Sequence, residues 1–160
     1  RLAFLEHLME RRPVLLSSVL LRQNPHNVHE WHKRAKLFED NPQKVVLTYT
    51  EAVKTVDAAK STGKPHTLWC KFARFYEEHN DVSNARVIFE KATQVPFKSV
   101  DDLATVWCEY AEMELRACNV DQARELLERA TAEHPGGRRQ AGKSVQDGPV
   151  QYRLHRSTKL

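Results

Sequence analysis

The feature that most constrains this chain is an internal repeat. Sliding the sequence by 38 positions lays Thr67 to Thr93 onto Thr105 to Thr131, with ten identities in 27 positions. The identical pairs are Thr67/Thr105, Trp69/Trp107, Cys70/Cys108, Ala73/Ala111, Val82/Val120, Ala85/Ala123, Arg86/Arg124, Glu90/Glu128, Ala92/Ala130 and Thr93/Thr131. Self-similarity at such a period is typical of stacked supersecondary units. The sequence therefore predicts a repeat protein.

Each copy has the pattern of two helices. The first carries apolar residues at three- and four-residue spacing, namely Trp69, Phe72, Ala73 and Tyr76. In the second, the small residues Ala85 and Ala92 flank the bulky Ile88 and Phe89, which allows two helices to approach closely. Asp81 and Asn119 precede the two second helices as candidate N-caps. We therefore expect an all-α fold, a right-handed α-solenoid of antiparallel helix pairs.

A looser copy lies upstream. Trp31 precedes Trp69 by the same interval as Trp69 precedes Trp107, and Ala35 follows Trp31 as Ala73 follows Trp69. Its second helix, residues 45–53, aligns only if the hairpin is two residues shorter, so that Tyr49 matches Phe89. The pattern divides the chain into a partial N-terminal repeat (1–26), repeats at 27–65, 66–100 and 101–135, a flexible basic loop (136–148) and the start of a further repeat (149–160).

The first segment is expected to form two short helices. Residues 2–11 and 14–22 are both apolar, and Pro13 suits the first turn of a helix. We therefore place a junction at residues 11–13 and the end of the second helix at Asn24-Pro25. Neither end of the chain shows a clear polar capping repeat, so the solenoid is expected to continue beyond both.

Composition excludes several classes of protein. No apolar run approaches the roughly 20 residues of a membrane span, so no membrane contact is expected. The three cysteines lack metal-site spacing and are expected to be thiols in a reducing compartment. The net charge of +4 permits contact with RNA phosphates, but the basic residues are dispersed. Basic residues cluster only at Arg11-Arg12 and at Arg138, Arg139 and Lys143. The second cluster lies in a glycine-rich stretch and is a secondary candidate for RNA contact.

The repeat signature resembles a known family. Its first helix has the form Trp-x-x-(aromatic)-Ala and its second the form Ala-Arg-x-(Ile/Leu)-(Phe/Leu)-Glu-(Lys/Arg)-Ala. These patterns resemble the HAT repeat, the half-a-TPR motif of crooked-neck-like RNA-processing proteins. Longer strings are similar to the Syf-type pre-mRNA-splicing factors, also called XPA-binding proteins. These strings are Ser18 to His26, His29 to His32, Thr48 to Val53, Gly63 to Trp69 and Ala104 to Cys108.

The resemblance implies a non-catalytic scaffold in the nucleus. It implies membership of the spliceosome, in the Prp-nineteen-associated and intron-binding complexes, with other spliceosomal proteins including HAT-repeat subunits as partners. It also implies a link to transcription-coupled DNA repair. The alternative is an RNA-binding helical-repeat protein of RNA 3′-end or ribosomal RNA processing, which would need a continuous Lys/Arg stripe on the concave face. A TPR-like peptide adaptor is disfavoured because the Trp and Ala-Arg signature replaces the TPR positions.

The candidate site residues are structural rather than catalytic. The signature residues expected to hold the repeats together are Trp31, Trp69, Trp107, Ala73, Ala111, Ala85, Arg86, Glu90, Ala92, Ala123, Arg124, Glu128 and Ala130. The tryptophans are expected in the core rather than as base-stacking platforms, because they recur with the helix face. Arg86 with Glu90, and Arg124 with Glu128, are one helical turn apart. Alternatively, Glu77 or Glu114 on a facing helix holds the arginine.

No enzymatic chemistry is expected. His26, His29 and His32 are evenly spaced at every third position, and two of them could ligate a metal, but no cysteine or carboxylate completes the set. Gly63-Lys64-Pro65 lacks the upstream glycine of a phosphate-binding loop. We therefore expect no cofactor, metal or small-molecule substrate. The pattern leaves open which helices line the concave face.

Overall fold

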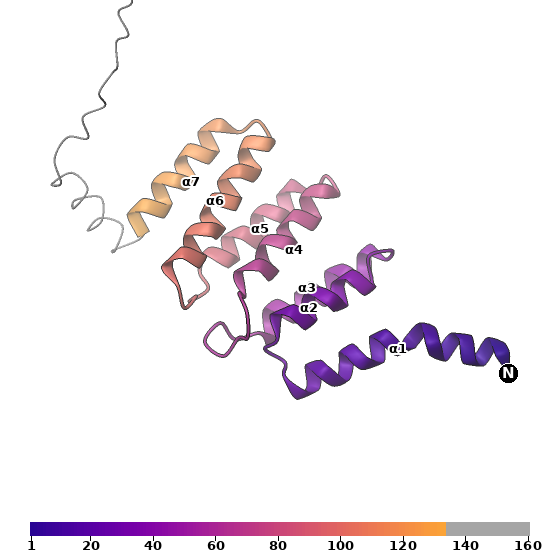
Figure 1. Cartoon of the computed structure of the whole chain (residues 1–160). Coiled ribbons are helices and arrows are strands. Elements are labelled where there is room, and N and C mark those ends of the chain that lie inside the picture. Colours follow the sequence, from indigo (N-terminus) through magenta and orange to yellow (C-terminus); the bar gives the residue numbers. More distant parts are fainter. Residues whose placement is uncertain (134–160) are drawn as a thin grey trace, which may run out of the picture.

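The chain folds as a stack of helical hairpins. The computed structural model describes residues 1–133. Its helices are α1 (Leu2–Gln23), α2 (Val28–Leu37), α3 (Pro42–Thr55), α4 (His66–Glu78), α5 (Val82–Thr93), α6 (Val100–Arg116) and α7 (Val120–Glu133). Figure 1 shows α2/α3, α4/α5 and α6/α7 as antiparallel pairs that lie side by side, with α1 next to the first pair. The predicted all-α solenoid of helix pairs is confirmed.

Repeated turn chemistry closes the second and third hairpins. Asn80 and Cys118, which occupy the same position in successive repeats, both take left-handed backbone angles (φ 59° and 62°). The N–H that follows each one reaches back to the first helix, from Asp81 to Tyr76 O at 2.9 Å and from Asn119 to Glu114 O at 2.8 Å. This is the Schellman arrangement, which satisfies carbonyls at a helix end. Each hairpin therefore turns tightly at the same repeat position.

Cys118 is an unfavourable residue for its turn. A left-handed angle costs most L-residues roughly 1–2 kcal/mol, and asparagine tolerates it better. We expect Cys118→Asn to raise the free energy of unfolding by about 1 kcal/mol, measured by urea titration. Cys118→Ala serves as the control, because it removes the thiol but keeps the strain. Equal stability of the two variants would contradict the assignment of strain at this position.

The N-caps agree only partly with the sequence. Asp81 caps α5, since its carboxylate accepts from the backbone N–H of Asn84 at 3.1 Å, as predicted. Asn119 uses its side-chain amide differently and donates to Glu114 Oε2 at 2.9 Å. Its role is therefore tied to a buried carboxylate, which is described below.

Small buried residues let the two helices of a hairpin pack closely, and stacked aromatic rings connect one hairpin to the next. Ala73, Ala85 and Ala92 are completely buried within the second hairpin. Between hairpins, the rings of Phe89 and Tyr110 stack at 5.1 Å with planes 9° apart. Tyr49 and Phe72 stack in the same way, at 5.6 Å and 19°. The two stacks occupy equivalent positions, so one contact is repeated along the solenoid.

The three tryptophans are not equally buried. Trp31 and Trp107 are 6% and 2% exposed, whereas Trp69 is only partly buried and packs against the edge of the core. The guanidinium of Arg129 lies 5.3 Å from the Trp107 ring and covers it. One repeat earlier this position holds Lys91, which is exposed. Trp69 therefore lacks the arginine that lies over Trp107, although the two tryptophans occupy equivalent positions in the repeat.

The N-terminal segment differs from its prediction. Residues 2–11 and 14–22 form one continuous helix, α1, with Pro13 inside it. The predicted junction at residues 11–13 is wrong because proline removes only one backbone hydrogen bond, and the helical residues on both sides keep theirs. Figure 1 shows α1 bent near its middle, as expected for an internal proline. The predicted end at Asn24-Pro25 agrees with the last residue of α1, Gln23.

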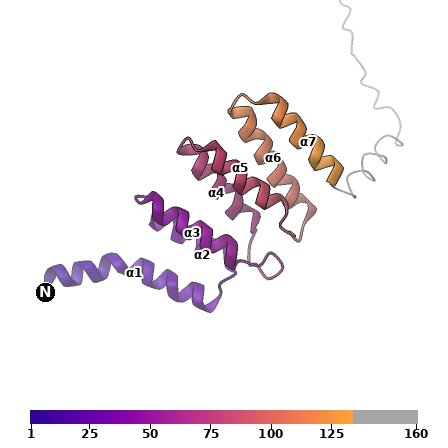
Figure 2. The same ribbon diagram turned by 180° about the vertical axis from the view of Figure 1, so that it is seen from behind.

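The helices form two layers. The first-helix layer comprises α2, α4 and α6, where α2 contacts α4 and α4 contacts α6. The second-helix layer comprises α3, α5 and α7, whose backbones lie farther apart, and long side chains bridge α5 and α7 through Arg129 and Glu90. Figures 1 and 2 view these two layers from opposite sides. Because neighbouring units lie closer on the inner side of a curved stack, the first-helix layer is the concave side, which answers the question that the sequence left open.

Candidate interaction surfaces

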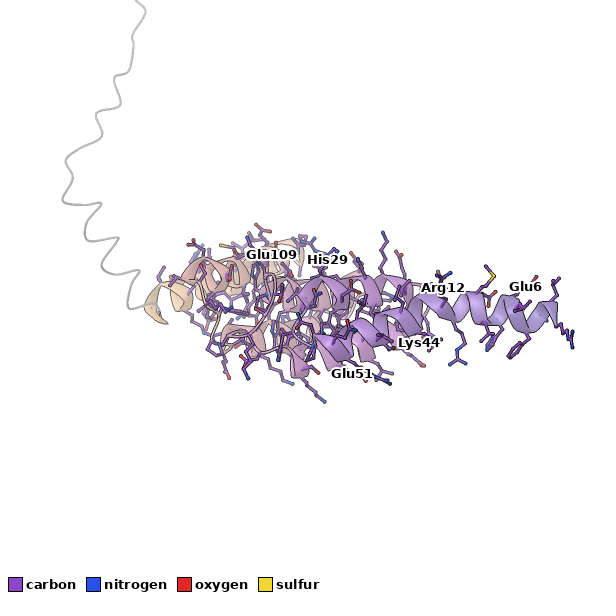
Figure 3. All side chains as sticks on the ribbon, turned by 60° about the horizontal axis from the view of Figure 1, so that its bottom comes forward. Glu6, Arg12, His29, Lys44, Glu51 and Glu109 are labelled. Atoms are coloured by element: carbon purple, nitrogen blue, oxygen red, sulfur yellow. The ribbon has the colours of Figure 1, made fainter. Side chains whose placement is uncertain are left out.

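The exposed side of the first-helix layer has an ordered pattern of charge. Figure 3 shows His29 of α2 and Glu109 of α6 on this side, opposite Lys44 and Glu51 of α3. The second and fifth positions after each tryptophan hold Lys33 and Lys36 on α2, Lys71 and Arg74 on α4, and Glu109 and Glu112 on α6. We call Lys33, Lys36, Lys71 and Arg74 the basic square. The face is therefore basic over two helices and acidic over the third.

Two members of the basic square are paired with carboxylates. Lys33 Nζ lies 3.1 Å from Glu30 Oε1, and Arg74 Nη2 lies 3.1 Å from Glu109 Oε2. Lys36 and Lys71 make no ion pair with any other described residue. The positive charge of the square is therefore concentrated on Lys36 and Lys71.

His32 lies between α2 and α4 and stays neutral. The Thr67 hydroxyl donates to Lys64 O at 2.6 Å, so His32 Nε2, 2.9 Å away, donates to Thr67 Oγ1. Burial lowers the pKa of His32 to about 4, with smaller contributions from the charges of Lys71 and His29. The neutral ring thus completes a hydrogen-bonded join between the first two hairpins.

This join predicts a pH dependence of stability. In the unfolded chain His32 binds a proton near its ordinary pKa of 6.5, whereas in the folded chain it does so only near 4. The unfolded state binds more protons between these values, so stability falls as the pH falls from 6.5 toward 4. We expect His32→Gln to reduce this loss, measured by urea titration across that range. The exposed His7→Gln should keep the wild-type slope, and an unchanged slope in His32→Gln would contradict the assignment.

Two of the signature residues, Arg86 and Glu90, form ion pairs between hairpins. Arg86 Nε lies 2.6 Å from Glu114 Oε1, and Arg86 Nη2 donates to Glu114 Oε2 at 3.1 Å. Glu90 accepts from Arg129 at 2.9 Å and from the Tyr110 hydroxyl at 3.1 Å. Arg86 therefore does not pair with Glu90. One of the two expected glutamates, Glu114, holds it, but Glu114 belongs to the next hairpin, so the contact fixes the join between hairpins rather than the geometry of one hairpin. These contacts join α5 to α6 and α7.

Glu114 is the most buried charge in this set. Its side chain has no exposed surface, whereas 40% of the Arg86 side chain is exposed. Burial alone would raise the pKa of Glu114, but the hydrogen bonds from Arg86 and Asn119 outweigh it, and the pKa lies below its usual value. The carboxylate is therefore held charged at the boundary between the second and third hairpins.

The outer side of α7 repeats the chemistry of α5. Arg124, Leu127 and Glu128 stand one full repeat after Arg86, Phe89 and Glu90. Arg124 pairs only loosely with Asp121, at 3.8 Å, and its side chain is 69% exposed. Leu127 is 46% exposed. The kinds of side chain that join α5 to the next hairpin are thus present again at the equivalent positions of α7, the last described helix.

An apolar groove lies at the opposite end of the stack. It measures about 480 Å³ and runs between α1, which contributes Pro13, Leu16 and Leu20, and α2, which contributes Leu37. Lys33 and Lys36 also line it, so the groove adjoins the basic square. Figure 3 shows the N-terminal half of α1, marked by Glu6 and Arg12, extending beyond the hairpins. Several large apolar residues of α1 are exposed: Leu2, Phe4, Leu5, Leu8, Met9, Leu15, Leu16 and Val19.

The residues considered for chemistry have structural contacts. His26 Nδ1 accepts from the backbone N–H of Asp57 at 3.1 Å and so holds the connector between the first two hairpins. Within residues 1–133, no group of three or more His, Cys, Asp or Glu side chains is arranged to hold a metal. Burial raises the pKa of the Cys70 thiol to about 12, so this thiol stays protonated. None of the described helices is long and apolar enough to cross a membrane.

Some predicted residues lie outside the described part of the chain. They are the candidate RNA contacts Arg138, Arg139 and Lys143, the loop at 136–148 and the further repeat at 149–160. The basic square, in contrast, was missed from the sequence although its residues are described. Its signal was available, because counting from each tryptophan aligns Lys33 with Lys71 and Lys36 with Arg74. The missing information was which side of the helix faces solvent.

Comparison with known proteins gives two family matches. Residues 58–160 match the family described as the pre-mRNA-splicing factor Syf1/CRNKL1 C-terminal HAT repeat. Residues 1–56 match the family described as the pre-mRNA-splicing factor SYF1 middle HAT repeat. The two matches meet at the connector between the first and second hairpins.

Individual relatives agree with these matches. The chain is 64% identical to human pre-mRNA-splicing factor SYF1 over 104 residues, which are 65% of this chain and 12% of the human protein. It is 60% identical over the same length to the Drosophila melanogaster syf1 homolog, again covering 65% and 12%. It is 48% identical to Schizosaccharomyces pombe cwf3 over 103 residues, covering 64% and 13%. The matched region spans only about an eighth of the length of these relatives. Because the family match at residues 58–160 covers more than half of the sequence, the chain belongs to the Syf1/CRNKL1 family of HAT-repeat proteins.

Proposed function

We propose that this chain is a non-catalytic HAT-repeat scaffold that acts in pre-mRNA splicing in the nucleus. The observation that carries the proposal is the 64% identity, over 104 residues, to human SYF1, a protein named as a pre-mRNA-splicing factor. In such a scaffold the rigid stack sets the distance between partners, and affinity comes from many contacts along the solenoid. The partners are other spliceosomal proteins, including HAT-repeat subunits of the Prp-nineteen-associated and intron-binding complexes.

The architecture supports a scaffold role in two ways. The concave first-helix layer presents charged side chains in register, and both ends of the stack present residues suited to further helices. The alternative, an RNA-binding solenoid, would need a basic stripe along the whole concave face. The stripe formed by Lys33, Lys71 and their neighbours ends at Glu109 and Glu112 on α6. The charge pattern therefore favours protein partners over a continuous polyanion.

The test is a pull-down of tagged 1–160 from nuclear extract, with and without ribonuclease, read by mass spectrometry. We expect spliceosomal proteins to be enriched over a tag-only bait and to survive ribonuclease. Loss of these proteins with the RNA would replace the scaffold with the RNA-binding function. Enrichment of no spliceosomal protein in either condition would contradict both. Recovery of transcription-coupled repair factors in the same samples would extend the scaffold role to DNA repair.

A further inference from the structure

The basic square carries positive charge that the chain itself does not neutralise. Glu30 pairs with Lys33 and Glu109 pairs with Arg74, which leaves Lys36 and Lys71 without an ion pair among the described residues. The charge of Lys71 also reaches across to α2, because it helps lower the pKa of His32. The cations of α2 and α4 therefore act on the same region of the concave face.

Carboxylates limit this positive region on two sides. Glu109 and Glu112 take the equivalent positions on α6. Asp40, in the turn after α2, and Glu78, the last residue of α4, are also equivalent to each other. A long polyanion that crossed the face would meet these carboxylates and be repelled. The positive region is thus suited to a short acidic segment rather than to a continuous phosphate backbone.

Base stacking finds no fully exposed aromatic ring on this face. Every Phe, Tyr and Trp ring within α2, α4 and α6 is at least partly buried. Proteins that bind single-stranded RNA combine a basic groove with aromatic rings on which bases stack. The first-helix face offers the charge without a fully exposed ring, which favours a peptide over RNA.

An apolar anchor point lies directly beside the basic square. The apolar walls of this groove of about 480 Å³ are Leu16, Leu20 and Leu37. Its charged rim holds Lys33 and Lys36 together with Glu30, which pairs with Lys33, and Glu39. A partner segment that carries an apolar side chain next to its acidic residues would fill the groove and reach the lysines at once. Buried apolar contact would supply affinity, and the lysines would supply specificity and speed of association.

We propose that the first-helix face over α2 and α4 binds a short acidic segment of a protein partner. The carboxylates of the segment pair with Lys36 and Lys71, and a neighbouring apolar side chain enters the groove between α1 and α2. This inference rests on the scaffold function proposed above and names the chemistry of one of its partners.

The test is direct binding of a synthetic probe to the 1–160 chain by fluorescence anisotropy. The probe is a fluorescein-labelled peptide of Glu and Asp residues around a Leu-Leu pair, and its Gln/Asn counterpart is the uncharged control. We expect the acidic peptide to bind more tightly and to weaken as salt rises, because exposed charges are screened. The double variant Lys36→Glu/Lys71→Glu should raise the Kd by at least about tenfold.

Matched variants separate this surface from general charge effects. Lys54→Glu/Lys91→Glu makes the same change of charge at exposed positions of α3 and α5 and should keep the Kd within about twofold. Leu16→Asn should weaken binding, whereas Leu47→Asn, at an exposed leucine of α3, should not. If a charge reversal lowers the thermal midpoint, the Lys36→Gln/Lys71→Gln variant is compared with Lys54→Gln/Lys91→Gln instead.

Two results would overturn the inference. One is an unchanged Kd in the folded Lys36/Lys71 variants. The other is poly(U) RNA that binds more tightly than the peptide and loses affinity in the same variants, which would assign the face to RNA. Either result leaves the nuclear-extract pull-down to decide the scaffold function separately, since that experiment samples every surface of the chain.

Discussion

Replacing Trp107 with alanine should lower the free energy of unfolding by about 3–5 kcal/mol, the range for removing a large buried aromatic side chain. Trp107 is 2% exposed, and the Arg129 guanidinium lies over its ring. The variant would lose the apolar burial, leave a cavity between α6 and α7, and remove the ring beneath the arginine. Because small domains have only about 5–15 kcal/mol of stability, the third hairpin should unfold far more readily.

The measurement is urea unfolding followed by circular dichroism, with Trp69→Ala as the matched control. Trp69 occupies the equivalent position but is only partly buried, so its loss should cost less, about 2 kcal/mol. The comparison tests burial rather than residue type. Equal losses in the two variants would contradict the difference in packing seen between the repeats.

The second large effect is expected from Arg86→Ala, which should cost about 3 kcal/mol, because removing one partner of a buried ion pair leaves the other charge uncompensated. Here the remaining charge is Glu114, whose side chain is completely buried. The estimate is at the lower end of the usual range because 40% of the Arg86 side chain is exposed, so water can partly replace it.

The equivalent arginine of the last repeat provides the control. Arg124 takes the place of Arg86 one repeat later, is 69% exposed and pairs with Asp121 only at 3.8 Å. Arg124→Ala should therefore change stability by no more than about 0.5 kcal/mol. Similar losses for Arg86→Ala and Arg124→Ala would show that the pair with Glu114 contributes little.

Acid provides a second readout of the same pair. The folded chain holds the pKa of Glu114 below its ordinary value of 4.5, so this group stabilises the protein above that pH and loses its contribution as the pH falls through the lowered value. In Arg86→Ala, burial should instead raise the pKa, and protonation would relieve the unpaired charge. The stability gap between the two proteins should thus be largest near neutral pH and shrink on acidification. A gap independent of pH would contradict this account.

The repeat itself was readable from the sequence because burial repeats with it. Ala85, Ile88, Phe89 and Ala92 are all buried, as their spacing predicted. The shortened first hairpin was also aligned correctly, since Tyr49 makes the same inter-hairpin stack as Phe89. Period and residue size together specify which helix faces meet, and this information is local to each unit.

The joins between units were harder to predict. Arg86 and Glu114 are 28 residues apart, and Glu90 and Arg129 are 39 apart. Arg86 and Glu90 are one helical turn apart, so the sequence favours a pair between them. The three-dimensional stack shows instead that each side chain reaches the next hairpin. Pro13 failed as a signal for a similar reason. A proline disfavours helix only at its own position and the one before it, whereas the continuity of α1 depends on the hydrogen bonds of the whole helix.

The joins also differ in kind along the stack, which has a mechanical consequence. In the described part, the second and third hairpins are linked by Arg74–Glu109, Arg86–Glu114, Arg116–Glu77 and Arg129–Glu90. The first and second are linked by an aromatic stack and the neutral His32–Thr67 hydrogen bond. We therefore expect the stiffness of the solenoid to be uneven. Bending should concentrate between α3 and α4. Helices α4 to α7 should then move as one rigid body, and α1 with the first hairpin should rotate relative to it.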